Sequence, residues 1–248
     1  MELNTIGIRH LELVQQKGDN MKRTIEIRAA EGGEDSKLFV SDLATAYSKL
    51  GMKLGWTTRL IDVRLGECSL LVEGADLSGL DNEPGGHRIQ RVPPTERKGR
   101  VHTSTVTVAV IDSTLVKSSV TIPNSDLKIE WYSGTGAGGQ YRNKHQNSCR
   151  ITHLPTGIIA KAECRSRTNS LDEAMNAIQT RVDTAAERCY NSNIASNRKS
   201  QVGSGMRGDK IRTYRFQDDR VQDHNSELTA KCSTVLKGNF DLLWPKKM

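Results

Sequence analysis

A glycine-rich stretch, SGTGAGGQYRNK at residues 133–144, most constrains what this chain can fold into. Gly134, Gly136 and Gly139 match the G-x-G-x-x-G template, in which a helix follows the glycines and its N-terminus faces a pyrophosphate. The residues that follow, 140–150, are polar and have no apolar stripe of helical period, and no P-loop lysine is present. The sequence therefore argues against a dinucleotide site. A flexible hairpin tip, or a loop that presents its backbone to another molecule, remains open.

The segments around this loop predict an α+β arrangement rather than regular βαβ units. A strand-like run, DLKIEWYS, precedes the loop, and RITHLPTGIIAKAEC after it reads as a hairpin turning at residues 155–157. Residues 171–190 predict a helix, with capping-box spacing between Ser170 and Glu173. Its apolar stripe consists of Leu171, Met175, Ile178, Val182, Ala185 and Cys189.

The rest of the chain predicts a second module, a mixed sheet with a helix. Ile25 and Ile27 alternate with polar residues as in a strand. A helix is expected before Gly51, a suitable C-terminal stop, with Leu38, Phe39, Leu43, Tyr47 and Leu50 at helical spacing. Residues 59–65, 69–74 and 101–110 read as strands, and 211–248 as short strand-like runs with a last apolar turn.

Charge and composition point to a polyanionic partner. Residues 141–215 carry 14 Lys and Arg against 6 Asp and Glu, a net of +8, whereas the whole chain carries +7. A basic balance concentrated in one stretch favours nucleic acid over a merely solvated face. The five cysteines are widely spaced, so we expect reduced thiols, no metal site and no cofactor. No secretion signal or apolar run of membrane-spanning length is present, and we expect a soluble protein without a membrane partner.

Gly138, Gly139 and Gln140 carry the most specific chemical hypothesis. Glycines allow a close backbone approach, and a bare N–H group can stabilise an oxyanion. No nucleophile–base pair or pair of carboxylates accompanies them in the loop. A hydrolytic role would then depend on positioning and hydrogen bonding rather than on a protein nucleophile.

The order of several motifs resembles one family. S-G-x-G-A-G-G-Q followed by R-I-T-H-L-P-T-G-I resembles the catalytic domain of class I peptide chain release factors of bacteria and organelles. EIRAAEGGEDSKLF, GGHRIQRVPPTERKGRVHTSTVTVAV and GSGMRGDKIRTYRFQDDRVQDH resemble, in the same order, the codon-recognition domain of that family. The resemblance covers about residues 24–240. It implies a short N-terminal helix or arm (1–23), a codon-recognition superdomain (24–112 with 204–248) and a Gly-Gly-Gln catalytic domain (113–203).

The resemblance also implies roles for individual residues. Pro93-Pro94-Thr95 stands where the family has the Pro-x-Thr motif, which implies reading of UAA and UAG. Gly32 and Asp35 would contact the first base, His102 would wedge between the second and third, and Gln90 and Thr103 would read the third. Gly138, Gly139 and Gln140 would reach the peptidyl transferase centre, where water attacks the peptidyl-tRNA ester. Basic residues expected to face rRNA phosphates are Arg142, Lys144, Arg150, Arg165, Arg167, Arg198 and Lys199.

The implied partners are the ribosome, at both its decoding and peptidyl transferase centres, the mRNA stop codon and peptidyl-tRNA. A methyltransferase acting on Gln140 is a further expected partner. Only about 23 residues precede the codon domain, so the family's N-terminal helical domain is expected to be missing and dependence on the GTPase release factor to be weak or absent. Asp35 replaces the usual Glu, Tyr141-Arg142 replaces His-Val, and CRSRTNS replaces a more basic segment. This compact, divergent form suggests a phage or organelle-like origin, and because no transit peptide is recognisable we favour a phage protein acting in the cytoplasm of a bacterial host.

Two other functions stay open from the sequence. A codon-independent rescue hydrolase would also carry Gly-Gly-Gln, but it would pair this with a basic tail, whereas here the tail is only PKKM. A non-catalytic protein that occupies the A site is the other alternative, and the intact Gly138-Gly139-Gln140 argues against it. In either active form, ester hydrolysis would require the ribosome, so the chain is not expected to be a stand-alone enzyme.

Overall fold

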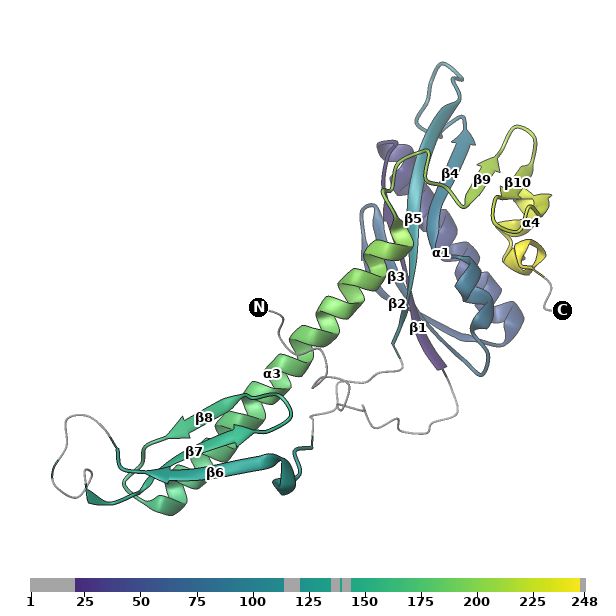
Figure 1. The fold of residues 1–248 in the computed structure, drawn as a ribbon. Coiled ribbons are helices and arrows are strands. Elements are labelled where there is room, and N and C mark those ends of the chain that lie inside the picture. Colours follow the sequence, from purple (N-terminus) through teal and green to yellow (C-terminus); the bar gives the residue numbers. More distant parts are fainter. Residues whose placement is uncertain (1–20, 114–120, 135–138, 140–143, 246–248) are drawn as a thin grey trace. The chain divides into compact units, whose positions relative to one another are not determined.

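The computed structural model describes residues 21–113, 121–134, 139 and 144–245. These residues form two compact units, each with its own core (Figure 1). Of the described residues, the larger unit holds 21–113 and those from Ile194 onward, and the smaller unit holds those from 121 to Asn193. None of the described helices is both long enough and apolar enough to cross a membrane.

The larger unit is built on a mixed eight-stranded sheet in the order β11-β10-β9-β4-β5-β1-β3-β2. Neighbouring strands pair antiparallel except β4 and β9, which pair parallel. The strand bounds are β1 Met21–Ala29, β2 Thr57–Arg64, β3 Glu67–Gly74, β4 Gly85–Arg91, β5 His102–Asp112, β9 Arg212–Arg215, β10 Arg220–Asp223 and β11 Thr229–Lys231. This confirms the predicted α+β class with a mixed sheet.

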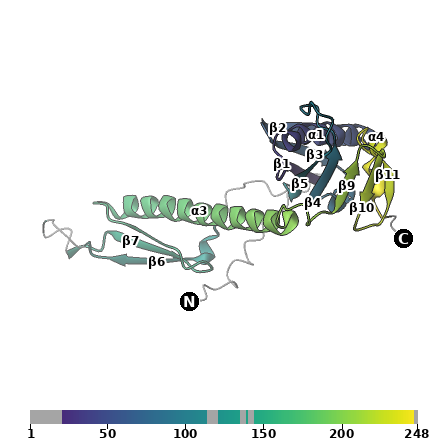
Figure 2. The ribbon, with the colours of Figure 1, turned by 90° about the horizontal axis from the view of Figure 1, so that it is seen from above.

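Helix α1 (Glu34–Leu54) covers one face of this sheet (Figure 2). Phe39, Leu43, Tyr47 and Leu50 are fully buried as the helical spacing predicted, whereas Leu38 is exposed. Short helical turns η2 (Ser78–Asn82), α4 (Cys232–Val235) and η4 (Phe240–Leu243) complete the unit, and their apolar residues Leu80, Val235, Phe240 and Leu243 join the same core.

The predicted stop of α1 at Gly51 is wrong, because the helix continues to Leu54 and ends at Gly55. Gly55 adopts the left-handed conformation (φ 73°), and its N–H donates to the carbonyl of Gly51. Gly51 itself lies inside the helix, where a Cβ would come within 2.3 Å of Thr58 Cγ2. Glycine at position 51 therefore permits the close approach of β2 rather than ending the helix.

Helix α3 spans Arg167–Val202, and the smaller unit packs its part up to Asn193 on an antiparallel sheet of three strands. These strands are β6 (Leu127–Tyr132), β7 (Ser148–His153) and β8 (Ile159–Ala162), preceded by the short turn η3 (Asn124–Asp126). Ala174, Ile178 and Val182 of α3 are buried against Cys149, Ile151 and Ala160 of the strands. The predicted hairpin at residues 155–157 is confirmed, with Gly157 at φ 69°.

The predicted capping box at Ser170 is wrong, because α3 begins three residues earlier, at Arg167. Ser170 is buried and its hydroxyl oxygen accepts from the backbone N–H of Cys164 at 2.9 Å, so it fastens the approach to the helix instead of capping it. Its presumed partner, Glu173, accepts a hydrogen bond from the Cys164 thiol. The helix also runs twelve residues beyond the expected end at 190.

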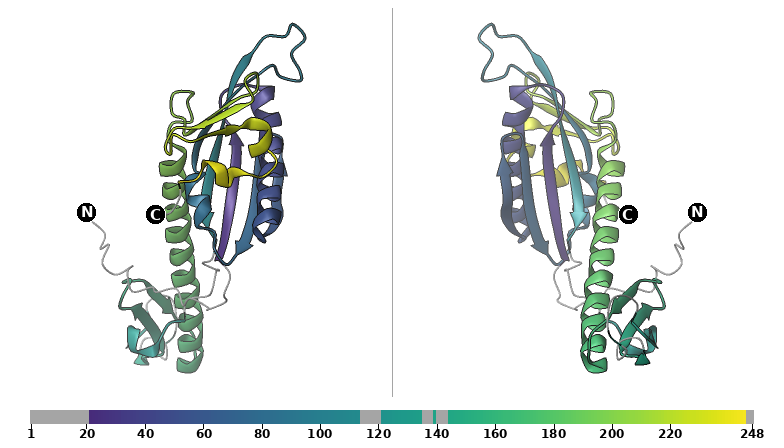
Figure 3. Two further views of the ribbon diagram at one scale, coloured as in Figure 1. Left: turned by 90° about the vertical axis from the view of Figure 1, so that its right-hand side faces the viewer. Right: turned by 90° about the vertical axis from the view of Figure 1, so that its left-hand side faces the viewer.

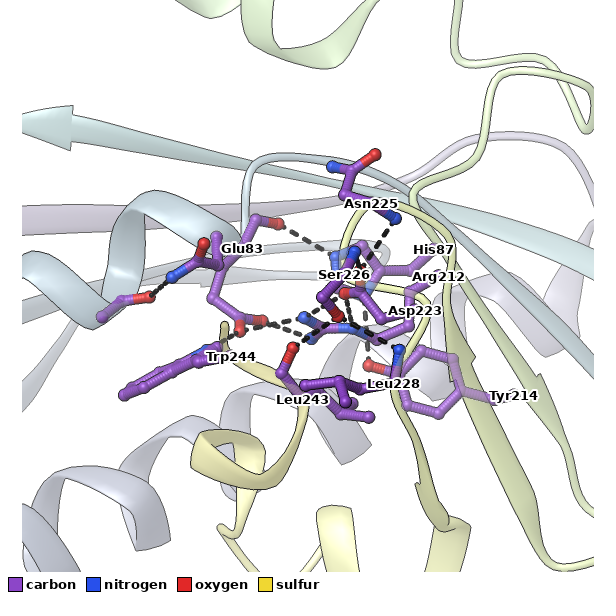
Figure 4. A network of polar contacts seen from close by, with 12 residues as sticks. Glu83, His87, Arg212, Tyr214, Asp223, Asn225, Ser226, Leu228, Leu243 and Trp244 are labelled. Atoms are coloured by element: carbon purple, nitrogen blue, oxygen red, sulfur yellow. Dashed lines mark hydrogen bonds and ion pairs between the residues drawn. The ribbon is translucent and has the colours of Figure 1, made fainter. Parts of the chain in front are cut away.

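A buried ion network crosses the larger unit and is centred on Arg212 (Figure 4). The Arg212 guanidinium donates to both carboxylate oxygens of Glu83, at 2.6 and 3.2 Å, and to Asp223 Oδ2 at 2.9 and 3.0 Å. Arg212 and Glu83 are both fully buried. Glu83 also accepts hydrogen bonds from the Tyr47 hydroxyl and the Trp244 indole, each at 2.7 Å. The network thus joins α1, β9, β10 and the C-terminal turn.

His87 of β4 belongs to the same network, and its tautomer follows from its partners. Nε2 lies 3.0 Å from the carbonyl oxygen of Glu83, which can only accept, so Nε2 carries the hydrogen. Nδ1 is then the acceptor for the Tyr214 hydroxyl at 3.2 Å. Burial and the nearby Arg212 cation lower the pKa of His87 to about 4. His87 is therefore neutral in the folded protein at physiological pH.

The burial of neutral His87 predicts that the free energy of unfolding decreases as the pH is lowered from 6.5 to 4.5. The unfolded chain takes up a proton at His87 below pH ~6.5 whereas the folded chain does not, so stability present above that pH is lost as the pH falls toward 4. We expect a loss of about 2–3 kcal/mol by pH 4.5. Urea unfolding at several pH values should show a flatter pH profile for His87→Gln, and parallel profiles for the two chains would contradict this account. His224, whose pKa is also lowered by burial, is common to both chains.

Candidate functional site

The predicted codon-reading residues come together at one end of the larger unit. Strands β4 and β5 form a hairpin in which Gln90 faces Thr103 and Arg91 faces His102. The connecting loop, residues 92–101, carries Pro93-Pro94-Thr95 and projects beyond the sheet (Figure 3). We call residues 92–101 the hairpin loop. The long hairpin, whose strand β5 is rich in β-branched residues, thus presents Pro94 and Thr95 of the motif to solvent.

A turn shapes the hairpin loop around its motif. The N–H of Glu96 donates to the carbonyl of Pro93 at 3.0 Å, which places Pro94 at the second position of a β-turn. Proline suits that position because its ring fixes φ near −65°. Pro93 is buried, whereas Pro94 and Thr95 are exposed. The Thr95 hydroxyl is therefore carried on a stiff turn and open to a partner.

Glu96, which the sequence reasoning missed, organises the same loop. Its carboxylate accepts hydrogen bonds from the Lys98 backbone N–H at 2.7 Å and the Arg100 guanidinium at 3.0 Å. Its Oε2 also lies 2.8 Å from Nε2 of His102. These bonds, with the Lys98 N–H first, lower the pKa of Glu96 below its ordinary value. A carboxylate among Arg97, Lys98 and Arg100 was the available signal in the sequence.

Gly32 and Asp35 lie beside this hairpin, at the start of α1. Gly32 has φ 130°, and a Cβ there would come within 2.5 Å of the Ser104 side chain, so only glycine fits. The N–H of Thr105 donates to the carbonyl of Glu31 at 2.6 Å, which fastens this segment to β5. Both features bring the turn before α1 into contact with the strand that carries Thr103.

The carboxylate of Asp35 points into the protein, which differs from its expected contact with a base. It accepts from Arg91 Nε at 2.7 Å and from the Ser104 hydroxyl at 2.9 Å, and the side chain is only 2% exposed. Arg91 also bonds Asp42 at 2.9 Å and lies near the rings of Phe39 and Phe216. Asp35 and Arg91 therefore join the start of α1 to the end of β4, because each satisfies the charge of the other.

The second predicted site, the glycine loop, is described only in part. Gly139 is exposed, and nothing described lies within 4 Å of a Cβ built on it. Gly138, Gln140 and Arg142 lie outside the described residues. The ends of the loop are closed by the β6–β7 ladder, in which Tyr132 faces Ser148. Asn147 Nδ2 also donates to the carbonyl of Arg165 at 3.2 Å.

The basic residues expected to face RNA differ in their surroundings. Lys144, Arg165 and Lys199 are exposed. Arg150 lies over the ring of Tyr132 and Arg167 over that of Trp131. Arg198 donates to both carboxylate oxygens of Glu26 at 2.6 Å, so it fastens the end of α3 to β1 instead of standing free for a phosphate.

Metal ligands do not cluster in the described part of either site. Among the described residues, no group of His, Cys, Asp and Glu side chains has an arrangement that could hold a metal ion. His153 is buried, and its Nδ1 lies 2.7 Å from the Thr156 hydroxyl. Burial lowers the pKa of His153, which is consistent with a structural role at the hairpin turn.

Comparison with known proteins agrees with this arrangement. The PCRF domain model matches residues 3–108 and the RF-1 domain model matches residues 116–225. Peptide chain release factor 1 of Malacoplasma penetrans is 42% identical over 238 residues (93% of this chain, 66% of the relative), and that of Mycoplasma genitalium is 43% identical over 242 residues (94% and 67%). The chain belongs to the class I peptide chain release factors. It spans about two thirds of the length of these curated relatives.

A solved structure also resembles this release factor. RF2 of Thermus thermophilus matches with a TM-score of 0.53 and 25% sequence identity, over 94% of this chain and 68% of that one. The likeness supports the α+β fold of both units. It also agrees with the family that the motif order indicated from sequence.

The contacts of Glu96 predict that this residue stiffens the hairpin loop of the release factor. Replacing Glu96 by Gln removes the negative charge to which the Lys98 N–H, Arg100 and His102 bond. The backbone amide hydrogen of Lys98 should therefore exchange with solvent several-fold faster. Hydrogen exchange measures this, with Asp62→Asn on exposed strand β2 as the matched control. Unchanged protection of Lys98 would show that Glu96 does not organise the loop.

Proposed function

We propose that this release factor recognises UAA and UAG in the ribosomal A site and triggers hydrolysis of peptidyl-tRNA at the peptidyl transferase centre. The observation that carries the proposal is the exposed Thr95 on its proline turn, next to the facing pair Gln90 and Thr103. Single-stranded bases are read by hydrogen bonds on their edges and by stacking on side chains. This hairpin end offers both kinds of contact in one place.

Each residue at the hairpin end is proposed to have a distinct role. Thr95 both donates and accepts, and its stiff turn loses little order on binding. His102, half exposed and held through Nε2 by Glu96, stacks between bases, while Gln90 and Thr103 read the third base. Gly32 contributes backbone groups at the first base. Asp35 positions that segment through Arg91 and Ser104 rather than presenting its carboxylate.

The release step is assigned to the glycine loop. We propose that Gly138 and Gly139 shape the backbone so that the N–H of Gln140 stabilises the oxyanion that forms as water attacks the ester carbonyl. The bond from the acyl carbon to the tRNA 3′ oxygen then breaks, leaving a peptide carboxylate and a tRNA hydroxyl. The Gln140 side chain admits water and excludes bulkier nucleophiles. The loop acts only with the ribosome, so the factor is not a stand-alone enzyme.

The other expected partners remain proposals. Lys144 and Arg165, both exposed on the side of the glycine loop that leads into β7, and Arg142 within the loop are proposed to contact rRNA phosphates, which would make binding sensitive to salt. A methyltransferase is proposed to modify Gln140. Dependence on the GTPase release factor is proposed to be weak or absent. The place of action is the bacterial cytoplasm, that of the host if a phage encodes the chain.

A single-turnover release assay tests this function and the role of Gln140 together. Ribosomes carrying labelled peptidyl-tRNA would display UAA, UAG, UGA, a sense codon or an empty A site. We expect release on UAA and UAG. On other codons the release rate should fall by roughly 5- to 150-fold or more for each mismatched base, because a wrong base leaves the polar groups that would read the correct one unpaired. Gln140→Pro, which lacks the N–H, should release about 10²–10³-fold more slowly, while Gln140→Ala keeps much of the rate.

Three outcomes would contradict the proposal. Equal release on every codon or on an empty A site would indicate a codon-independent rescue hydrolase. Binding without release on UAA and UAG would indicate a non-catalytic occupant of the A site. Equal loss in the two Gln140 variants would remove the backbone N–H from the mechanism.

A further inference from the structure

Two aromatic side chains stand at the point where β6 leads into the glycine loop, and a guanidinium covers each of them. The Cζ atom of Arg167 lies 4.0 Å from the centre of the Trp131 ring, and that of Arg150 lies 5.7 Å from the centre of the Tyr132 ring. Trp131 and Tyr132 are the last two residues of β6. The closer and more favourable pair is Arg167 with Trp131, since tryptophan is the best partner for a cation over a ring.

Trp131 is well placed to transmit this contact. Its ring packs against the core of the smaller unit, and its backbone faces Cys149 of β7 in the ladder. Arg167 is the first residue of α3. The pair therefore links the start of the helix to the strand end from which the glycine loop departs.

The segment before α3 also holds the other end of the loop. Asn147, one residue before β7 begins, donates to the carbonyl of Arg165 at 3.2 Å. Residues 165–167 thus contact the chain on both sides of the loop, through a backbone carbonyl on one side and a stacked guanidinium on the other. Arg165 contributes its carbonyl to this contact, and the side chains of Arg165 and Arg167 are both exposed.

We propose that Arg167 is a positioning residue that acts through Trp131 to hold the base of the glycine loop. By lying over the indole, Arg167 fixes the direction in which the chain leaves β6 and hence the reach of Gly138, Gly139 and Gln140. This role replaces the phosphate contact expected for Arg167 from sequence. It rests on the proposed function of the loop in peptide release.

A double-mutant cycle on Trp131 and Arg167 tests the proposal, with Arg188→Gln as the matched control. Arg188→Gln removes the same charge from an exposed side chain 21 residues further along α3. The release rate at saturating factor and the concentration for half-maximal rate would be measured separately on UAA-programmed ribosomes. Loss of a positioning residue lowers the saturating release rate. Loss of a phosphate contact instead raises the concentration for half-maximal rate and reduces its salt dependence.

We expect Arg167→Gln and Trp131→Leu each to lower the saturating rate about three- to tenfold, the range of a cation–π contact. The double variant should be no slower than the slower single variant, because each substitution alone already removes the same Arg167–Trp131 contact. Trp131→Phe, which keeps a ring, and Arg167→Lys, which keeps a cation, should recover part of the rate. Arg188→Gln should leave the saturating rate within about twofold of the unmodified factor.

Either of two results would overturn the proposal: multiplicative losses in the double variant, or an Arg167→Gln that behaves like Arg188→Gln, with an unchanged saturating rate. Trp131 fluorescence, taken as the difference from Trp131→Phe, tests the contact without any release activity. Arg167→Gln should make Trp131 more accessible to acrylamide, and Arg188→Gln should not. If the unmodified factor releases nothing on UAA, the proposed function fails, and the quenching result still decides whether Arg167 covers Trp131.

Discussion

The Arg212 guanidinium is fully buried, and the arrangement of the larger unit depends on how that charge is balanced. Glu83 and Asp223 supply two carboxylates, and Tyr47 and Trp244 satisfy the remaining acceptor positions of Glu83. Each partner comes from a different part of the chain, up to 161 residues apart. Removing one member of such a network leaves a buried charge uncompensated, so the loss of any one member strongly destabilises the larger unit. In the register of the only parallel pair among the described strands, Arg212 lies beside His87, so the network fixes β9 against β4.

The proposed codon-reading end takes its geometry from this sheet. Strand β4 runs from His87 through Gln90 to Arg91, and the hairpin loop begins at the next residue. Arg91 then joins this end to α1 through Asp35 and Asp42. Polar clusters thus follow one another along β4 and the hairpin loop. The buried Arg212 network fixes the position of β4, the Asp35–Arg91 ion pair fixes the start of α1, and Glu96 fixes the conformation of the loop. The smaller unit uses the same kind of device on its own loop, with a cation over an aromatic ring.

Local patterns allowed much of the fold to be predicted from sequence. Alternation and helical spacing predicted β1, the β2–β3 pair, β5, the turn at Gly157 and both long helices. Helix ends were predicted less well, because Gly51 and Ser170 are used for tertiary contacts that no local rule reveals. The residues of the candidate site could likewise be predicted only in part. Contiguous motifs such as Pro93-Pro94-Thr95 were visible, whereas the inward Asp35, the Arg198–Glu26 pair and the buried Arg212 depend on partners at least 11 residues away. Only the folded chain brings those partners together.

The most direct test of the central claim is the free energy of unfolding of Arg212→Leu. Urea unfolding would be followed by fluorescence in a Trp131→Phe background, so that Trp56 and Trp244, both in the larger unit, report the transition. Arg64→Leu, which breaks an exposed ion pair with Asp62 on β2, is the control. The account predicts a loss of about 3–5 kcal/mol for Arg212→Leu and less than about 1 kcal/mol for Arg64→Leu. A loss for Arg212→Leu as small as that of the control would contradict it.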